Sequence, residues 1–331
     1  MANNRIFYAV KQAGFSPDGS LNFTEVHGLQ SVGVNTTFEQ EQVFEIGQQE
    51  IYENIEGTPN VEVTMQKVLD GHHLIYHLAT KNAANPTLTG RSAVKTIAAL
   101  SYFPDTNVSA TGQPLSEVHM SGLFPSALTY TFPVDASFTE DVTFLGNHKI
   151  WVDSSCVGAP TVSSFVGQFT NTDSPASING SGGVNRREDM LFTATGSALD
   201  INSSSAEINV TVLPQDIFWI KSNGTKGSSH LQNITISANL GREPLFELGK
   251  RLPYFRFATF PIEVTTDIEA ISISGDMVSA TEAGCIAAVG TCGGGTNLSN
   301  RTIRIAVCEG TRVYTGKKNK LSGVTMGGGD A

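Results

Sequence analysis

The chain is poor in charge, in cysteine and in long apolar runs. Of its 331 residues, 16% are charged, 40% are hydrophobic and only four are cysteines. A coiled coil or a disordered chain carries more charge, and a small disulfide scaffold carries more cysteine. Since a chain of this length buries roughly 75% of its unfolded surface on folding, its size favours two ordinary domains with hydrophobic cores.

Basic residues are also scarce. The chain has 21 Lys and Arg residues against 31 Asp and Glu residues, which gives a net charge of −10. Binding to nucleic acid rests on the neutralisation of phosphates by Lys and Arg. The composition therefore argues against a protein that grips nucleic acid, although an acidic chain can border a passage for DNA without holding it.

Targeting and membrane segments are not evident. Residues 1–8 contain no apolar core of signal-peptide length, and no stretch approaches the ~18 apolar residues of a membrane helix. We therefore expect synthesis in a cytosol and no membrane partner. In that compartment Cys156, Cys285, Cys292 and Cys308 are thiols by default, and Cys285 and Cys292 pair only if the protein later meets oxidising surroundings.

Catalytic signatures are missing as well. The sequence contains no G-x-S-x-G, H-E-x-x-H, Walker-type or C-x-x-C motif and no complete G-x-G-x-x-G. The only suggestive cluster is His72, His73 and His77, in which the last two are spaced to share a helix face and offer two imidazoles to a metal. No cysteine beside them completes a tetrahedral set. We expect no catalytic residue, no cofactor and no metal.

Period-two alternation, rich in Thr, Val, Ser and Phe, dominates the sequence. The segments 29–38, 127–132 and 206–212 show it clearly and are typical of half-buried strands broken by Gly, Pro and Asn turns. Helical patterns occur at 72–81 and at about 280–289. The sequence thus predicts a mainly β protein with one short helix in each half.

A polar stretch at 155–187, rich in Ser, Gly, Asn and Pro, marks a boundary. It predicts a first domain at 1–155, a linker or extended arm at 156–204 and a second domain at 205–331.

The most informative feature is an internal repeat. Residues 29–64 align with 231–265 at a constant offset, with a one-residue deletion before Glu263-Val264-Thr265. The identical residues before that deletion are Leu29/Leu231, Gln30/Gln232, Glu41/Glu243, Phe44/Phe246, Glu45/Glu247, Gly47/Gly249, Tyr52/Tyr254 and Pro59/Pro261. The apolar replacements between the copies keep one sheet face. This ordered set predicts a duplicated β domain.

Four matched pairs are the candidate structural positions of the repeat. They are Phe44/Phe246, Gly47/Gly249, Tyr52/Tyr254 and Pro59/Pro261, and we expect the paired glycines at a bend or a close backbone contact. Two like domains in one chain can fill two like places in a closed ring. A ring with sixfold pseudo-symmetry would then need three chains, and a ring of six chains is the alternative.

The repeated segments resemble bacteriophage tail tube proteins. The resemblance is carried by "F-E-x-G" at 44–47, "Y-E-x-I" at 52–55, "P-x-x-E-V-T" at 59–64 and "L-D-G" at 69–71. It covers roughly 29–82 and 231–331, with weaker similarity over 94–150. The chain departs from the single-domain pattern because it carries two copies, and its second copy ends soon after Gly329.

This resemblance implies two tandem tail-tube-type domains, each a β-sandwich or half-barrel with one short helix. It further implies rings of copies of this chain, stacked into a hollow conduit for phage DNA and tape-measure protein. The implied location is the virion tail, assembled in the cytoplasm of a host bacterium. The implied partners are further copies, together with sheath, tape-measure, baseplate and terminator proteins. DNA would pass through the lumen without specific binding.

Two alternatives remain open. One is a terminator, baseplate or injection-device component built on the same domain. The other is a glycan-binding β-sandwich, which would stay monomeric and bind carbohydrate.

Overall fold

A computed structural model describes residues 10–47, 49–85, 87–103, 114, 116–153, 168–170, 183–187, 190–193, 229–272, 301–307, 312–319, 322–323 and 325. The chain divides into two compact units that interleave along the sequence. The first unit consists of 1–130, 139–184 and 236–265, and the second consists of 131–138, 185–235 and 266–331. The predicted boundaries of two tandem domains remain a prediction.

The described part of the chain is mainly β, as the alternation predicted. The helices are α1 (Ile75–Thr80) and α2 (Leu88–Ser92). The strands are β1 (Val10–Ser16), β2 (Asn22–Glu25), β3 (Leu29–Phe44), β4 (Ile51–Val68), β5 (Thr96–Tyr102), β6 (Ser116–Pro133), β7 (Thr139–Gly146), β8 (His148–Asp153), β9 (Gln168–Thr170), β10 (Met190–Thr193), β11 (Ser229–Asn239), β12 (Glu243–Leu245), β13 (Phe255–Phe257), β14 (Glu263–Ser272), β15 (Arg301–Val307) and β16 (Arg312–Asn319).

Most strands join one large sheet. Its order is β3-β4-β7-β6-β5-β1-β2-β9, while β8 and β11 also pair with β6, and β14 pairs with β11. The centre of this sheet follows the period of two that the sequence shows: β7 alternates between half-buried and buried residues along its whole length. On β4, Val63 and Met65 are buried and pair with Phe144 and Val142 of β7. The apolar face thus builds the core of the first unit.

Strand β6 changes its partners along its length. Its first half pairs with β5 and β8. Gly122 lies inside the strand with φ +70°, a conformation that glycine adopts without a steric penalty and that bends a strand. Beyond this bend, the Leu240 amide donates to the Ser126 carbonyl at 2.8 Å, where β11 pairs with β6. A strand of the second repeat therefore extends a sheet built by the first.

The predicted helix at 72–81 is confirmed in a shorter form, as α1. A second short helix, α2, follows it and was not predicted. The Thr87 hydroxyl caps α2 by accepting a hydrogen bond from the Gly90 amide at 3.2 Å, an N-cap arrangement that helices of any length favour. The helix predicted at 280–289 and the strand predicted at 206–212 lie outside the described residues.

Two smaller sheets complete the described structure. Strands β10, β15 and β16 form an antiparallel sheet in the second unit, and β12 pairs with β13. Two of the short strands, β9 and β10, lie within the stretch predicted as a linker or arm, where β9 pairs with β2 and β10 with β15. No helix in the described part of the chain is long and apolar enough to span a membrane.

Candidate functional site

Exposed apolar side chains concentrate on two hairpins. The first hairpin (29–68) consists of β3, β4 and the turn between them. The second hairpin (236–265) contains β12, β13 and the adjoining ends of β11 and β14. All but five of the exposed large apolar side chains in the described structure lie on these hairpins. The five exceptions are Leu21, Ile150, Trp151, Val184 and Ile271. Such concentrations on a protein surface mark interaction sites.

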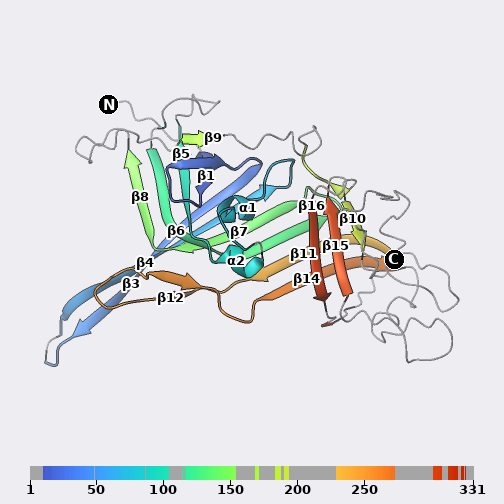
Figure 1. Cartoon of the computed structure of the whole chain (residues 1–331). Coiled ribbons are helices and arrows are strands. Elements are labelled where there is room, and N and C mark those ends of the chain that lie inside the picture. Colours follow the sequence, from blue (N-terminus) through green and yellow to red (C-terminus); the bar gives the residue numbers. More distant parts are fainter. Residues whose placement is uncertain are drawn as a thin grey trace. The chain divides into compact units, whose positions relative to one another are not determined.

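The first hairpin is a long antiparallel ladder with three shifts of register. Its partners run from Leu29 with Lys67 to Phe44 with Ile51, and Figure 1 shows it extending away from α1 and α2. The turn contains Gly47 with φ +95°, which explains why glycine is needed there. Beside this turn the side chains of Phe44, Ile46 and Tyr52 are 64%, 105% and 63% exposed.

The second hairpin repeats this arrangement at the matched positions. Gly249 has φ +85°, and Phe246, Leu248 and Tyr254 are 57%, 103% and 58% exposed. The Tyr254 amide donates to the Leu245 carbonyl at 3.0 Å, which closes the turn. The repeat thus places the same kind of side chain at the same kind of turn twice. A Cβ on either glycine would meet no atom within 4 Å, so both glycines lie at bends and neither at a close backbone contact.

The two prolines of the repeat lie in different local structures. Pro59 is inside β4, opposite Phe38, and its carbonyl accepts a hydrogen bond from Asn147 at 2.7 Å. Pro261 lies between β13 and β14 and follows a cis peptide bond. Pairing extends along the whole first hairpin, whereas in the second it is divided between β12 with β13 and β11 with β14.

Three arginines join the second hairpin to residues within 56–147. The Arg251 guanidinium donates to the carbonyls of Glu56 and Gly57 at 3.2 and 2.9 Å, and the Thr58 hydroxyl donates to the Arg251 carbonyl at 3.0 Å. These contacts join the turn of the second hairpin to β4 of the first hairpin. They depend on backbone carbonyls, because the nearest Glu56 carboxylate oxygen is 3.8 Å away.

The other two arginines are less exposed. Arg256 donates to the side-chain oxygen of Asn147 at 3.0 and 2.9 Å and to that of Asn60 at 3.2 Å. Arg242 donates to the carbonyls of Pro125 and Ser92, each at 2.7 Å. Burial lowers the pKa of Arg242 to about 10, which leaves it charged at neutral pH. Charge-assisted bonds of this kind are stronger than neutral ones.

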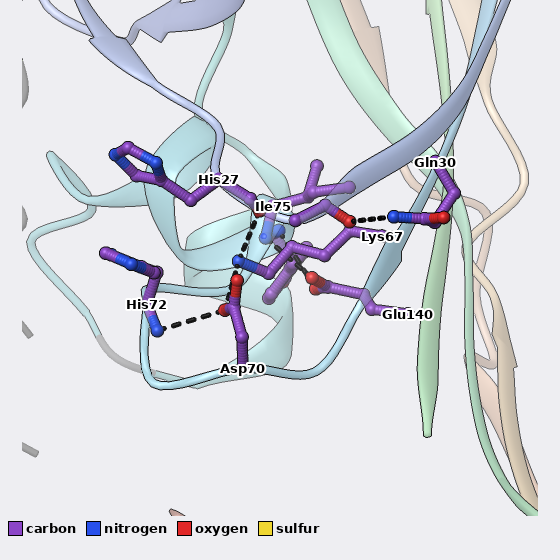
Figure 2. A network of polar contacts seen from close by, with 9 residues as sticks. His27, Gln30, Lys67, Asp70, His72, Ile75 and Glu140 are labelled. Carbon is purple, nitrogen blue, oxygen red and sulfur yellow. Dashed lines mark hydrogen bonds and ion pairs between the residues drawn. The ribbon is translucent and has the colours of Figure 1, made fainter. Parts of the chain in front are cut away.

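A buried polar network holds α1 against the sheet (Figure 2). Glu140 is fully buried on β7, and its carboxylate accepts from the amides of Ile75 and Tyr76 at 2.6 and 3.1 Å. The Tyr130 hydroxyl donates to the same carboxylate at 3.1 Å. Leu74, at the N-cap of α1, has no side-chain cap, so the carboxylate of a distant strand satisfies amides that the helix itself cannot.

Lys67 is the cation of this network. Its side chain is fully buried, and it donates to Asp70 at 2.9 Å and to the His27 carbonyl at 2.8 Å. Asp70 in turn accepts from the His72 amide at 3.0 Å (Figure 2). The "L-D-G" segment is thereby fixed at the start of α1, so these ionisable residues have a structural role.

The three histidines that could suggest a metal site each lie beside another histidine ring. His27 stacks on His72 with centroids 4.1 Å apart, and His73 lies 5.0 Å from His77. His77 also contacts the Arg91 guanidinium at 3.3 Å, and a cation at that distance opposes a metal ion. Within the described residues, no group of three potential metal ligands comes together.

One cluster has the composition of a hydrolytic triad, but its connections differ. Glu117 accepts from the Ser101 hydroxyl at 3.0 Å and contacts the His119 ring at 2.8 Å. In a catalytic triad the histidine lies between the serine and the carboxylate. Here the carboxylate lies between them, so the imidazole is not placed to take the serine proton. Ser101 is also only 1% exposed.

Comparisons with known proteins give weak structural similarities only. No protein family and no curated protein matches the chain. The tube-terminating cap of an anti-feeding prophage is 12% identical, with a TM-score of 0.33 over 46% of this chain and 100% of the cap. A chain of the extended sheath–tube complex of an extracellular contractile injection system is 14% identical, with a TM-score of 0.32 over 43% of this chain and 87% of that chain.

The sheath/tube terminator of such a system gives similar values. It is 15% identical, with a TM-score of 0.32 over 44% of this chain and 95% of the terminator. Similarity at this level carries no functional information.

Proposed function

We propose that this protein is a structural subunit of a tail-like tube, which assembles with further copies of itself through the two hairpins. In this proposal the copies form rings, three chains to a pseudo-hexamer, and the rings stack into a conduit for DNA and tape-measure protein. The location is a virion tail, and sheath, baseplate and terminator proteins are its further partners. The protein needs no catalytic residue for this function.

The pairing of β11 with β6 is the observation that carries the proposal. Within one chain, a strand of the second repeat adds to the sheet of the first, at the Leu240–Ser126 hydrogen bond. Strand β3 is the first-repeat counterpart of β11, and in the described structure it pairs only with β4. An open edge of 16 residues invites pairing with another chain. The same junction, repeated between chains, would close the ring and remove the edges.

The exposed turns support the same function. Phe44, Ile46 and Tyr52 on one hairpin and their counterparts on the other would lose contact with water in an assembly, which is favourable by about 25 cal/mol per Å² of apolar surface. The net charge of −10 suits a conduit, because an acidic wall repels phosphate and lets DNA slide.

The test is negative-stain electron microscopy of the purified chain, with native mass determination of any ring. We expect hollow tubes, or rings of three chains. Rings of six chains would retain the tube but refute the pseudo-hexamer. Single rings that never elongate would identify a terminator. A chain that stays monomeric at high concentration would refute the proposal and favour the glycan-binding alternative.

A pair of variants makes this test specific. Ile46→Ser combined with Leu248→Ser removes the two most exposed apolar side chains of the hairpins, and we expect it to prevent assembly. Leu21→Ser is the control, since Leu21 is 42% exposed but lies outside both hairpins. Equal assembly of both variants would show that the hairpins are not the assembly surface.

A further inference from the structure

The two hairpins share their apolar side chains but differ in charge. The matched segments are 34–64 and 236–265. The first contains seven glutamates and no basic residue, whereas the second contains four basic residues and three glutamates. The apolar side chains supply attraction that does not depend on which hairpin meets which. The interaction between the charged side chains, in contrast, depends on which two hairpins meet.

The difference is systematic along the aligned positions. Each basic residue of the second hairpin replaces an amide of the first: Arg242 for Gln40, Lys250 for Gln48, Arg251 for Gln49 and Arg256 for Asn54. Three glutamates of the first hairpin are replaced by apolar residues in the second: Glu50 by Leu252, Glu53 by Phe255 and Glu56 by Ala258. One copy is therefore acidic and the other basic and apolar, on a common backbone plan.

The chain already contains contacts between unlike hairpins. Arg251 of the second hairpin binds the backbone of Glu56 and Gly57 of the first. The first hairpin has Gln49 in place of Arg251, so it has no guanidinium with which to make this charge-assisted contact toward another copy of itself. Two first hairpins placed side by side would also bring fourteen glutamates together, and like charges across an interface are costly.

The open side of the first hairpin retains unpaired negative charge. Glu39 and Glu41 are exposed on the edge strand β3, and their carboxylates have no partner within the described part of the chain. On the second hairpin, Lys250 is 67% exposed and pairs only with Glu247 of its own turn among the described residues. These charges are complementary and available.

On this basis we propose that β3 of the first hairpin is the docking surface for the second hairpin of another copy of this chain, so that every junction in the assembly joins unlike repeats. This inference rests on the proposed function, since it names the partner of the same assembly surface. The unlike pairing gives the ring a strict alternation of first and second repeats. It also excludes rings in which only one repeat lines the channel.

Charge reversal on one side of the junction tests this pairing. Variant A is Glu39→Lys with Glu41→Lys, which makes the open side of the first hairpin basic. Variant B is Lys250→Glu with Leu252→Glu, which makes the second hairpin acidic and leaves the three anchoring arginines intact. We expect each variant alone to require a concentration at least about tenfold higher than the parent for assembly, because each would join like charges.

Mixing the variants should restore assembly. In an equimolar mixture, the basic open side of the first hairpin of variant A meets the acidic second hairpin of variant B, and the remaining hairpins keep their original complementarity. We expect tubes or rings that contain both variants in equal amounts by native mass measurement. The neutral variants, Glu39→Gln with Glu41→Gln and Lys250→Gln with Leu252→Gln, control for the loss of the original side chains and should not rescue one another.

The outcomes separate this inference from the proposed function. If the parent chain does not assemble, the proposed function fails. If the parent assembles and either variant alone assembles equally well, the unlike pairing is wrong. It is also wrong if both variants retain the far-UV circular dichroism of the parent but their mixture does not assemble.

A salt titration of the parent chain tests the pairing without any substitution. A charge-complementary junction predicts that the concentration required for assembly rises between 50 and 500 mM salt, because screening weakens exposed charge pairs. A required concentration that stays constant or falls would overturn the inference.

Discussion

Removal of the Glu140 carboxylate should destabilise the chain strongly. Glu140→Ala leaves the amides of Ile75 and Tyr76 and the Tyr130 hydroxyl without their acceptor in a fully buried position. It also removes the negative charge that faces the buried Lys67. An unsatisfied buried donor costs about 1–3 kcal/mol, and three donors lose their acceptor here. Because these contributions overlap, we expect a loss of about 4 kcal/mol in the free energy of unfolding.

Glu140→Gln should have a smaller effect, whose size depends on pH. The amide oxygen, in place of Oε1, can still accept from the Tyr76 amide and the Tyr130 hydroxyl, but the amide nitrogen then faces the Ile75 amide, which is also a donor. We therefore expect about half the loss. Burial raises the pKa of the Glu140 carboxyl above its ordinary value of 4.5, against the opposing effect of its hydrogen bonds and Lys67. A carboxyl with a raised native pKa loses stability as the pH rises from its unfolded pKa through its native pKa.

The glutamine cannot titrate, so its deficit relative to the parent should be largest below pH 4.5 and should shrink as the pH rises. Urea unfolding of the unassembled chain, followed by far-UV circular dichroism at several pH values, measures both effects. Hydrogen exchange of residues 75–80 localises them to α1. Glu45→Ala is the control, because Glu45 is exposed on the first hairpin. A loss below about 1 kcal/mol for Glu140→Ala would refute the structural role of this carboxylate.

Three further predictions concern single residues. Gly47→Val should hinder assembly more than it lowers monomer solubility. A β-branched residue at φ +95° costs about 1–2 kcal/mol in turn geometry, while no atom lies within 4 Å of the added Cβ. Normal tubes from this variant, seen by electron microscopy, would contradict the expectation. Hydrogen bonds from Ser16 and Ser20 lower the pKa of Asp18 to about 2. Its small contribution to stability should therefore persist above pH 4 and vanish as the pH falls through 2. Unfolding of the Asp18→Asn variant, measured over the same pH range, should lack this acid-dependent loss. Arg251→Ala should increase hydrogen exchange around Thr58, where the hairpins meet, and unchanged exchange would exclude the guanidinium as an anchor.

The strands and turns were largely predictable from the sequence. Alternation marks β3 and the end of β6 because half-buried strands repeat every two residues, and the matched glycines mark two turns with positive φ. These are local properties. Helix α2 could have been found from Thr87 followed by Gly90, since a threonine before a short polar segment is a capping signal, but the segment lacks the apolar period that identifies longer helices.

The polar anchors could not be predicted in the same way. Glu140 lies 65 residues from Ile75, and Arg242 lies 150 residues from Ser92. Nothing in the local sequence distinguishes a carboxylate that caps a distant helix from one that is solvated. The spacing of His73 and His77 does bring their rings together, 5.0 Å apart, but for the same reason it could not reveal that Arg91 contacts His77.

Two repeats in one chain allow the junctions of an assembly to differ from one another. In a ring of identical domains, every surface must complement the same neighbour, so a charge added to one junction appears at all of them. With two copies in one chain, the sequences can diverge while the turn geometry and the apolar side chains at Phe44/Phe246 and Tyr52/Tyr254 stay constant. In the assembly that we propose, the shared apolar side chains provide the affinity of every junction, and the charges decide which junctions form. The amide-to-basic replacements at four aligned positions are the divergence that this division of roles requires.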